Sequence, residues 1–297
     1  MDTEKLLDTT SEEINEIIAN TQRHYLRFTI KKHSGGNRII EAPSPILKRI
    51  QRNILDTILY KARAHPIAHG FAPFKSPKTN AEVHKDAKIL LTVDIKNFFP
   101  SINRNQVRNM FSFLNEKKKF VNLDLTSKDF DLLTELVTFA DELPQGAPTS
   151  PMLANLICLG MDKELKQLAM LGSLRVSRYC DDITFSTTDK DYDIGRLLKP
   201  VSAILHRHYF NLNKEKTRIL RTHRQQKITG VVINKELSAP KRYRKLVRAQ
   251  VHRWANKPHE ERTIEEYQKI RGRIAWIAFL NPKHGSQLLK KLGSKKP

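Results

Sequence analysis

Two adjacent carboxylates, Asp181 and Asp182, follow Tyr179 and Cys180 and lie between two stretches of alternating apolar residues. The alternation predicts a strand–turn–strand hairpin with the carboxylates at its tip. Carboxylate oxygens held there suit Mg²⁺, whose octahedron water and phosphate oxygens would complete. Because Asp is also a common turn residue, the pair alone is compatible with either a turn or a metal site.

A third carboxylate, Asp94, ends the apolar run at residues 89–93, which predicts a buried strand. Such a carboxylate is costly to desolvate unless it is paired, hydrogen-bonded or bound to a metal. If the two strands lie side by side, Asp94 and Asp181 would bridge two Mg²⁺ ions, with Asp182 adding ligation or charge. Mn²⁺ could replace Mg²⁺. The simpler alternative is that Asp94 caps a turn at the end of its strand.

Two further features would place a nucleotide beside these carboxylates. Phe98 and Phe99 follow Asp94; aromatic pairs usually pack in a core, but Phe99 could instead lie beneath a sugar and exclude a 2′-hydroxyl. The run LPQGAPTSP at 143–151 predicts a loop that leads into a helix. In it, Gly146 would allow close backbone approach, Gln145 offers an amide, and the helix start favours anions.

The charge of the chain favours a polyanionic partner. The 297 residues carry a formal net charge of +22, and residues 214–297 hold 23 Lys and Arg against 6 Asp and Glu. This excess predicts nucleic acid rather than a membrane as the partner, although a basic surface can also be merely solvated. Two cysteines provide no disulfide framework, and no signal peptide is visible, so a cytoplasmic protein is expected.

The periodicity of apolar residues predicts a mixed α+β chain. Helices are predicted at 11–20, 46–62, 127–140, 151–170, 193–208, 241–254 and 264–280. Strands are predicted within 24–42, at 89–93, on both sides of residues 179–182, at 217–220 and at 228–233, while 66–79 is expected to be a loop. Lys241, Lys245 and Arg248 share one face of a predicted helix and are candidates for contacts with a nucleic-acid backbone.

The sequence resembles the reverse transcriptases. DIKNFF around Asp94, LPQGAPTSP and YCDD resemble three motifs of that family and occur in its order, and the likeness covers about residues 24–235. The resemblance implies a right-hand polymerase with fingers, a palm whose antiparallel sheet bears the Asp cluster, and a helical thumb. We expect fingers and N-terminal helices at 1–90, the palm at 91–232 with a helical fingers insertion at about 104–142, and a basic thumb at 233–297.

The same resemblance assigns residues that would bind the dNTP. Arg38 lies in NRIIEAP (37–43), which resembles the fingers strand that holds the triphosphate, and Lys216 lies in NLNKEKTRIL (211–220), which resembles a later triphosphate motif. Together with Phe99, Gln145 and Gly146 they form the expected dNTP site.

Two short segments resemble the retron subgroup of bacterial reverse transcriptases. Asn80 and His84 fit an NAxxH pattern, and Thr229 with Gly230 fits a VTG pattern that here has Ile for Val. All four are expected to contact RNA. The likeness implies a cognate structured noncoding RNA as template and primer, priming from an internal guanosine 2′-hydroxyl, a branched RNA–DNA product (msDNA), and antiphage defence with a separate effector protein.

Three other functions stay open at this point. The chain could be another small bacterial reverse transcriptase, of the group II intron or abortive-infection type. It could be an RNA-dependent RNA polymerase, against which Phe99 argues. From a different class, it could be a noncatalytic basic RNA-binding protein, which would tolerate loss of all three Asp residues.

Overall fold

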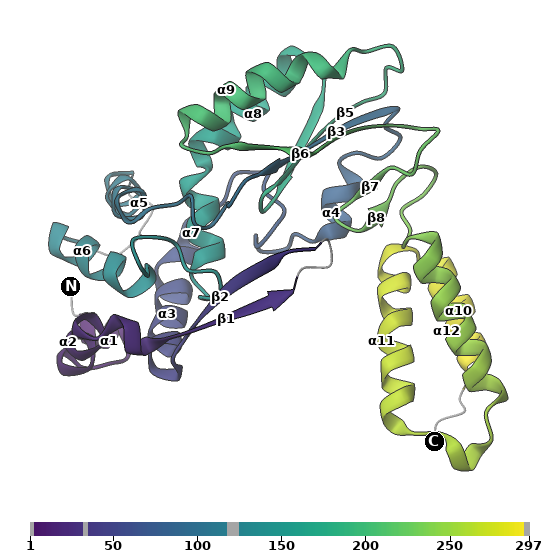
Figure 1. Cartoon of the computed structure of the whole chain (residues 1–297), viewed down its shortest axis with the longest axis horizontal. Helices are drawn as coiled ribbons and strands as arrows, with labels where there is room; N and C mark the ends of the chain where they lie inside the picture. Colours follow the sequence, from purple (N-terminus) through teal and green to yellow (C-terminus); the bar gives the residue numbers. More distant parts are fainter. Residues whose placement is uncertain (1–2, 32–34, 118–124, 294–297) are drawn as a thin grey trace.

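A four-stranded antiparallel sheet forms the centre of the molecule (Figure 1). The computed structural model describes residues 3–31, 35–117 and 125–293. The sheet has the order β4-β5-β3-β6, with β3 (Ile89–Ile95), β4 (Arg175–Tyr179), β5 (Asp182–Thr187) and β6 (Leu212–Arg221). The almost continuously apolar β3 is buried along its length between β5 and β6, as expected for a central strand.

Four helices of the region after residue 149 contribute to the main hydrophobic core together with this sheet. They are α7 (Ser150–Ile157), α8 (Leu159–Leu171), the short η3 (Ile194–Leu197) and α9 (Leu198–Arg207). The helix predicted at 151–170 is thus two helices that meet at Cys158. Ser150 is the first residue of α7: its hydroxyl donates to the carbonyl of Pro144 at 2.7 Å, and the residue before the helix is Thr149.

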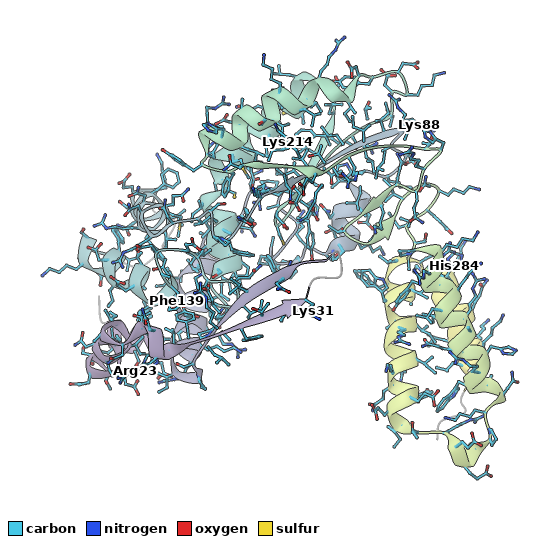
Figure 2. The ribbon with its side chains drawn as sticks, viewed as in Figure 1. Arg23, Lys31, Lys88, Phe139, Lys214 and His284 are labelled. Atoms are coloured by element: carbon cyan, nitrogen blue, oxygen red, sulfur yellow. The ribbon has the colours of Figure 1, made fainter. Side chains whose placement is uncertain are left out.

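The N-terminal part combines a long hairpin with short helices. It contains α1 (Thr3–Leu7), α2 (Ser11–Ala19), η1 (Thr21–His24), β1 (Tyr25–Lys31), β2 (Asn37–Pro43), α3 (Pro45–Thr57) and η2 (Leu59–Lys61). The helix predicted at 11–20 begins at Ser11 and is capped by Thr10. Residues 32–34, between β1 and β2, lie outside the described residues. The hairpin extends toward the C-terminal helices, with Lys31 near its described end (Figure 2).

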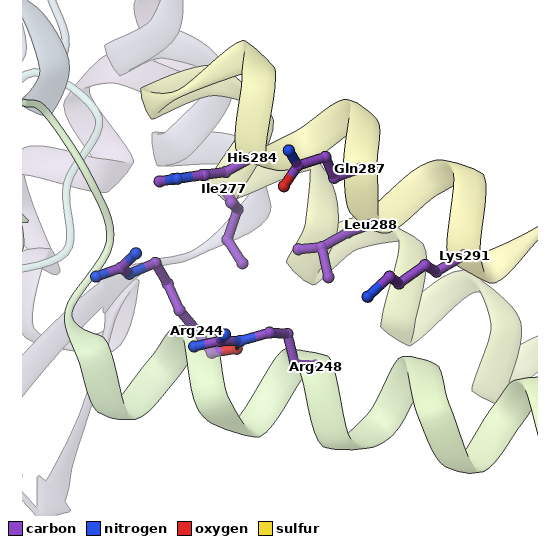
Figure 3. Close-up of a pocket in the computed structure, with 7 residues that line it drawn as sticks. All are labelled: Arg244, Arg248, Ile277, His284, Gln287, Leu288 and Lys291. Carbon is purple, nitrogen blue, oxygen red and sulfur yellow. Dashed lines mark hydrogen bonds between the residues drawn. The ribbon is translucent and has the colours of Figure 1, made fainter.

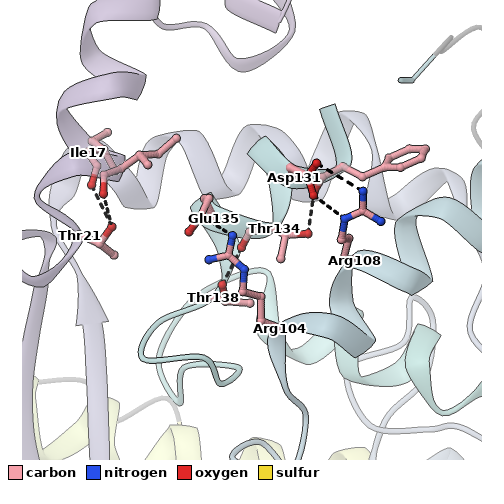
Figure 4. Close-up of polar contacts among 10 residues, drawn as sticks. Ile17, Thr21, Arg104, Arg108, Asp131, Thr134, Glu135 and Thr138 are labelled. Carbon is pink, nitrogen blue, oxygen red and sulfur yellow. Dashed lines mark hydrogen bonds and ion pairs between the residues drawn. The ribbon is translucent and has the colours of Figure 1, made fainter. Parts of the chain in front are cut away.

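Two helices of the insertion expected at about 104–142 pack beside this part, and the second of them is the helix predicted at 127–140. They are α5 (Arg104–Glu116) and α6 (Ser127–Val137). Ion pairs join them: Arg104 bonds Glu135, and Arg108 bonds Asp131 (Figure 4). Asn103 and Thr126 each close a capping box at the helix starts.

The C-terminal part is a bundle of α10 (Lys241–Asn256), α11 (Ile264–Leu280) and α12 (Pro282–Leu292), with the short η4 (His259–Glu261) between the first two. The helix α12 is not predicted by the sequence, because a proline after a helix is also typical of a helix end. Here Pro282 stands in the first turn of α12, where its missing N–H costs nothing, and Asn281 caps the helix. The core of the bundle also includes Ala81, Ala87 and Leu90, so the bundle is anchored to the sheet region.

The remaining differences concern segments with turn residues. The predicted loop at 66–79 contains the start of α4 (Pro77–Glu82), which Ser76 and Thr79 begin with a capping box. The predicted strand at 228–233 is two short strands, β7 (Lys227–Ile228) and β8 (Val231–Val232), because Thr229 and Gly230 turn with φ of 46° and 84°. No helix within the described ranges is both long and apolar enough to cross a membrane.

Candidate active site

The sheet brings the three predicted carboxylates to one end. Asp94 of β3 is directly opposite Asp182 of β5 in the antiparallel register, and the backbone N–H of Ile95 donates to the carbonyl of Asp181 at 2.9 Å. The strands therefore place Asp94, Asp181 and Asp182 together, as the sequence predicted, although 87 residues separate the first two.

The hairpin turn is one residue earlier than its expected apex. Tyr179 pairs with Asp182, so Cys180 and Asp181 are the two turn residues. Cys180 has a φ of 57°, a conformation that turns of this kind usually give to glycine. A non-glycine residue there is strained and persists only where its surroundings hold it.

Gly70 is one of the residues that hold this turn. A Cβ added to it would lie 2.6 Å from the backbone nitrogen of Cys180, which is a steric clash, so only glycine fits at this position. Its carbonyl accepts a hydrogen bond from the Asn155 amide at 2.8 Å, and the neighbouring His69 N–H donates to the carbonyl of Arg178 at 2.7 Å. The segment that the sequence predicted as a plain loop thus supports the turn that bears Asp181.

A buried ion pair, which sequence analysis missed, holds the same turn from below. The guanidinium of Arg178 and the carboxylate of Asp162 are both fully buried and share two hydrogen bonds of 2.7 Å. A third guanidinium nitrogen donates to the carbonyl of Cys180 at 3.0 Å. The sequence offered one signal for this pair. Asp162 lies in the apolar stripe of α8 and Arg178 lies in a buried strand, and two buried opposite charges are each stable only when they are paired.

Asp94 is held by two side chains of β6. The ammonium of Lys216 donates to Oδ1 at 2.7 Å and the amide of Asn213 donates to Oδ2 at 3.0 Å. Asp94 is only 5% exposed, whereas Lys216 reaches solvent. The hydrogen bond to Asp94, together with the other nearby carboxylates, raises the pKa of Lys216. In this arrangement the ammonium of Lys216 is bonded to the carboxylate of Asp94, and its contact with a triphosphate stays a prediction.

The other two carboxylates lie in an environment that disfavours their charge. Desolvation raises the pKa of Asp181, and the charge of Asp94 adds to the effect, while Lys216 and Arg38 oppose it. Asp182 has one side open to solvent, yet desolvation and the charges of Asp181 and Asp94 raise its pKa to about 7. A divalent cation would relieve this repulsion.

The donor set fits Mg²⁺ or Mn²⁺, which prefer carboxylate and water oxygens. Within the described ranges, no group of three His, Cys, Asp or Glu side chains is already arranged so that it could hold a metal ion. Lys216 supplies the positive charge next to Asp94 that a bound cation would otherwise supply. Asp94, Asp181 and Asp182 are therefore the residues that would hold the metal.

The predicted dNTP residues lie around this end of the sheet to different degrees. Arg38, exposed on β2, is near enough for its charge to act on Asp181. The carbonyl of Gln145 accepts a hydrogen bond from the Glu41 N–H at 3.0 Å. Gly146 has a φ of 151°, and a Cβ on it would lie 2.6 Å from the Glu41 carbonyl. Its close backbone approach is thus to β2, which links this loop to the hairpin bearing Arg38.

The two adjacent phenylalanines have separate environments. Phe98 is buried and packs on Phe210 with ring centroids 5.6 Å apart, so it is a core residue. Phe99 packs on Phe98 at 5.4 Å but is only half-buried. Of the pair, Phe99 alone is therefore available to a ligand, and its role as sugar gate stays a prediction.

Asn80 and His84 are buried, which contradicts their predicted direct contact with RNA. Both ring nitrogens of His84 are bonded, Nδ1 to the Ser186 hydroxyl at 2.7 Å and Nε2 to that of Ser177 at 2.8 Å. Burial lowers the pKa of His84 to about 3, so the ring is neutral. His84 thus joins β4 to β5, at the end of β5 far from Asp182.

The two weak motifs nevertheless meet in space. The amide of Asn80 donates to the Thr229 hydroxyl at 3.4 Å across a separation of 149 residues, and that hydroxyl donates to the carbonyl of Pro77. Thr229 is half-buried, and only Gly230 is exposed. Their position indicates a structural link between α4 and the segment before the thumb helices.

An antiparallel sheet with three carboxylates at one end, a long hairpin on one side and a helical bundle on the other defines a right-hand polymerase fold. A family model described as "Reverse transcriptase (RNA-dependent DNA polymerase)" matches residues 30–233. The chain belongs to the reverse transcriptase family. Accordingly, the β1–β2 part corresponds to fingers, the sheet to the palm and the C-terminal bundle to the thumb.

The curated relatives that the chain matches include several retron reverse transcriptases. The chain is 33% identical to the Retron Mx162 and Retron Mx65 reverse transcriptases of Myxococcus xanthus, with 92% and 91% of this chain aligned. It is 29% identical to the Retron Ec86 reverse transcriptase of Escherichia coli over 94% of this chain and 83% of that one. The chain spans 61% and 64% of the length of the two Myxococcus relatives.

Solved structures agree on the fold. A telomerase from Candida albicans, in complex with a fragment of telomeric RNA, matches with a TM-score of 0.54 over 92% of this chain and 58% of that one, at 11% identity. An apo telomerase from Candida tropicalis matches with a TM-score of 0.51 over 97% of this chain and 64% of that one, at 13% identity.

The raised pKa values of Asp181 and Asp182 predict that the ionisation of these carboxylates destabilises the metal-free fold. The folded state holds a proton on Asp182 more tightly than the unfolded chain, so its ionisation destabilises the metal-free fold progressively between about pH 4 and 7. Metal-free Asp182→Asn protein should melt at a higher temperature than wild type at pH 8, and the gap should narrow toward pH 5. Thermal melts in a chelator measure this. A gap that widens at pH 5 would contradict the assignment.

Proposed function

We propose that this chain is an RNA-directed DNA polymerase of the retron type. The observation that carries the proposal is the convergence of Asp94, Asp181 and Asp182 at one end of the palm sheet, beside Lys216 and within reach of the charge of Arg38. Paired carboxylates with two cations nearby suit the transfer of a nucleotidyl group, because both the hydroxyl and the leaving phosphates need charge compensation there.

The reaction follows from these groups. A primer hydroxyl oxygen forms a bond to the α-phosphorus of the dNTP, the bond from that phosphorus to the β-phosphate bridge breaks, pyrophosphate leaves and the hydroxyl proton is lost. Two Mg²⁺ ions, when bound, would lower the hydroxyl pKa and offset charge on the leaving pyrophosphate. Asp94, Asp181 and Asp182 would hold these ions, and Arg38, Gln145, Gly146 and Lys216 would position the triphosphate.

Lys216 has a second part in this proposal. Its ammonium neutralises Asp94 while no divalent cation competes for that carboxylate. If a divalent cation were held at Asp94, the long side chain of Lys216 would be free to contact the triphosphate, as the likeness of its motif implies. The bond between Lys216 and Asp94 then belongs to the resting protein, and dNTP binding requires its release.

The partners are proposed from the retron relatives. The template and primer would be one structured noncoding RNA, with synthesis starting at an internal guanosine 2′-hydroxyl to give branched msDNA. The chain would act in the cytoplasm, in antiphage defence, with a separate effector protein. Residues 1–90, 91–232 (with the 104–142 insertion) and 233–297 would serve as fingers, palm and thumb, and Lys241, Lys245 and Arg248, exposed on α10, would contact the nucleic-acid backbone.

Nucleic acid that copurifies with the protein from its native cells tests this proposal. A retron enzyme should carry one discrete RNA joined to DNA by a 2′–5′ branch, and the Asp181→Asn protein should carry the same RNA without DNA. Heterogeneous RNA would favour another small bacterial reverse transcriptase. RNA without any dNTP-dependent synthesis, in wild type and variant alike, would favour a noncatalytic RNA-binding protein.

Phe99→Val should reduce discrimination against ribonucleotides. The half-buried ring of Phe99 is proposed to fill the space that a 2′-hydroxyl would need, and valine removes most of that ring. We expect the ratio of dNTP to NTP incorporation, from kcat/KM on a primed RNA template, to fall roughly tenfold or more, which is about 1.4 kcal/mol. Phe113→Val, at an exposed ring on α5, is the matched control. An unchanged ratio in Phe99→Val would remove the gate assignment.

A further inference from the structure

A pocket of about 220 Å³ lies between α10 and α12 of the thumb (Figure 3). Arg244 and Arg248 enter it from α10, and Gln287 and Lys291 enter from α12. Ile277 and Leu288, both buried, form its apolar base. We call this the thumb pocket. The helices that line it stand apart from the four-stranded sheet (Figure 1).

The charges in the thumb pocket are not compensated. Among the described residues, no carboxylate lies within ion-pair distance of Arg244, Arg248 or Lys291. The Nε of Arg244 is buried and has no hydrogen-bond partner there. Three like charges around one small volume repel each other, and a buried donor without a partner is costly, so an anion bound here would relieve both.

The rim of the pocket does not alter this balance. His284 lies there with its Nε2 3.7 Å from an oxygen of Glu236, whose side chain is 58% exposed and therefore well screened by water. The Nδ1 of His284 is also buried and has no hydrogen-bond partner in the described structure, so it is a second buried polar atom that lacks a hydrogen bond.

The location separates this pocket from the side of the thumb that is turned toward the fingers. In Figure 1, α11 is the thumb helix on the side of β1 and β2, whereas the pocket lies between the other two helices. A group bound in the pocket would therefore lie between the two thumb helices other than the one turned toward β1 and β2.

We propose that the thumb pocket binds a phosphate group of the RNA partner, outside the template–primer duplex. The inference deepens the proposed function, since it rests on RNA being the partner. Arginine forks match phosphate oxygens with paired hydrogen bonds, Lys291 adds a point charge and Gln287 an amide donor. The phosphate is either a terminal 5′-monophosphate or an internal phosphodiester, which share this chemistry.

The test compares two double variants of α10 that remove the same charge. Arg244→Gln/Arg248→Gln alters the pocket, and Lys241→Gln/Lys245→Gln alters exposed lysines of the same helix that do not line it. The probes are two short RNA hairpins of one sequence, with a 5′-hydroxyl or a 5′-monophosphate and a 3′ fluorophore. Fluorescence anisotropy at fixed salt gives each Kd, because backbone contacts are strongly salt-dependent.

We expect the pocket variant to weaken binding about tenfold or more and the lysine variant about threefold, because paired contacts to a phosphate exceed screened surface charge. A large loss confined to the 5′-monophosphate hairpin assigns a terminal phosphate. An equal large loss for both assigns an internal phosphodiester. If both variants lose the same affinity for both hairpins, the pocket is only part of a diffuse basic surface and the proposal is overturned.

Two further measurements keep the outcome interpretable. Arg248→Lys preserves charge but not the fork and should give an intermediate loss, while thermal melts show whether Arg244→Gln still folds; if it does not, the exposed Arg248→Gln alone carries the comparison. The binding assay needs neither dNTPs nor the cognate RNA. A failed pocket would therefore leave the polymerase proposal standing, and a failed polymerase assay would leave the pocket result intact.

Discussion

Asp181→Asn is expected to abolish DNA synthesis while RNA binding and the fold are retained. Asparagine keeps the shape of the side chain but removes the charge that would bridge two metal ions, so the transition state loses its charge compensation. The rate of dNTP incorporation should fall by at least about a thousandfold, which is about 4 kcal/mol of transition-state stabilisation. Primer extension on a defined RNA template measures the rate, and hairpin anisotropy measures RNA binding.

Asp191→Asn is the matched control, because Asp191 is an exposed aspartate just beyond β5 and loses the same charge far from the turn. It should synthesise DNA at the wild-type rate. Asp182→Asn should lose less activity than Asp181→Asn, because Asp182 is the more exposed of the pair and is proposed to add charge rather than to bridge. Retained synthesis in Asp181→Asn, with Asp191→Asn unchanged, would remove the site assignment.

Asp162→Asn should be the most destabilising single change that we propose. It leaves the fully buried guanidinium of Arg178 without its counter-charge, and breaking such a pair costs roughly 3–5 kcal/mol. The free energy of unfolding, from denaturant titration followed by circular dichroism, should fall by that amount. Glu164→Gln is the control: it also removes an acid of α8 that pairs with an arginine, but that pair is partly exposed and should cost about 1 kcal/mol or less.

The double variant Asp162→Leu/Arg178→Met separates stability from positioning. Removing both charges leaves no unpaired ion, so much of the lost stability should return. DNA synthesis should stay low, because methionine cannot donate to the carbonyl of Cys180 and the strained turn loses that support. If the double variant regains both stability and activity, Arg178 is only a core residue and does not position the turn.

The sequence was sufficient for the elements that bear the carboxylates. The apolar run of β3 and the alternation around residues 179–182 determine strands locally, and the palm fold followed from their joint likeness to one family. The polymerase fold was confirmed, while the roles of Arg38, Phe99, Gln145, Gly146 and Lys216 stay predictions. The register that sets Asp94 opposite Asp182 is a property of the assembled sheet, and residue periodicity alone does not determine it.

What could not be predicted depends on contacts between different helices and strands, which local residue patterns do not determine. His84 looked like a surface ligand because its partners, Ser177 and Ser186, are 93 and 102 residues away. The pairing of Asp162 with Arg178 requires knowing that α8 passes beneath β4. Pro282 was misinterpreted because proline ends one helix and begins the next with equal ease, and only the packing of α12 on α10 and α11 decides between them.

The shared core of palm and thumb has a consequence for how the chain folds as it is made. Ala81, Ala87 and Leu90 are buried against thumb residues, and Asn80 bonds Thr229 across 149 residues. On a ribosome that adds about 5–20 residues per second, this apolar surface stays exposed for roughly 10–30 seconds until the thumb residues that bury it have been synthesised. The segment before Asp94 is thus covered last, and a nascent chain stalled before residue 240 would expose this apolar surface to chaperones.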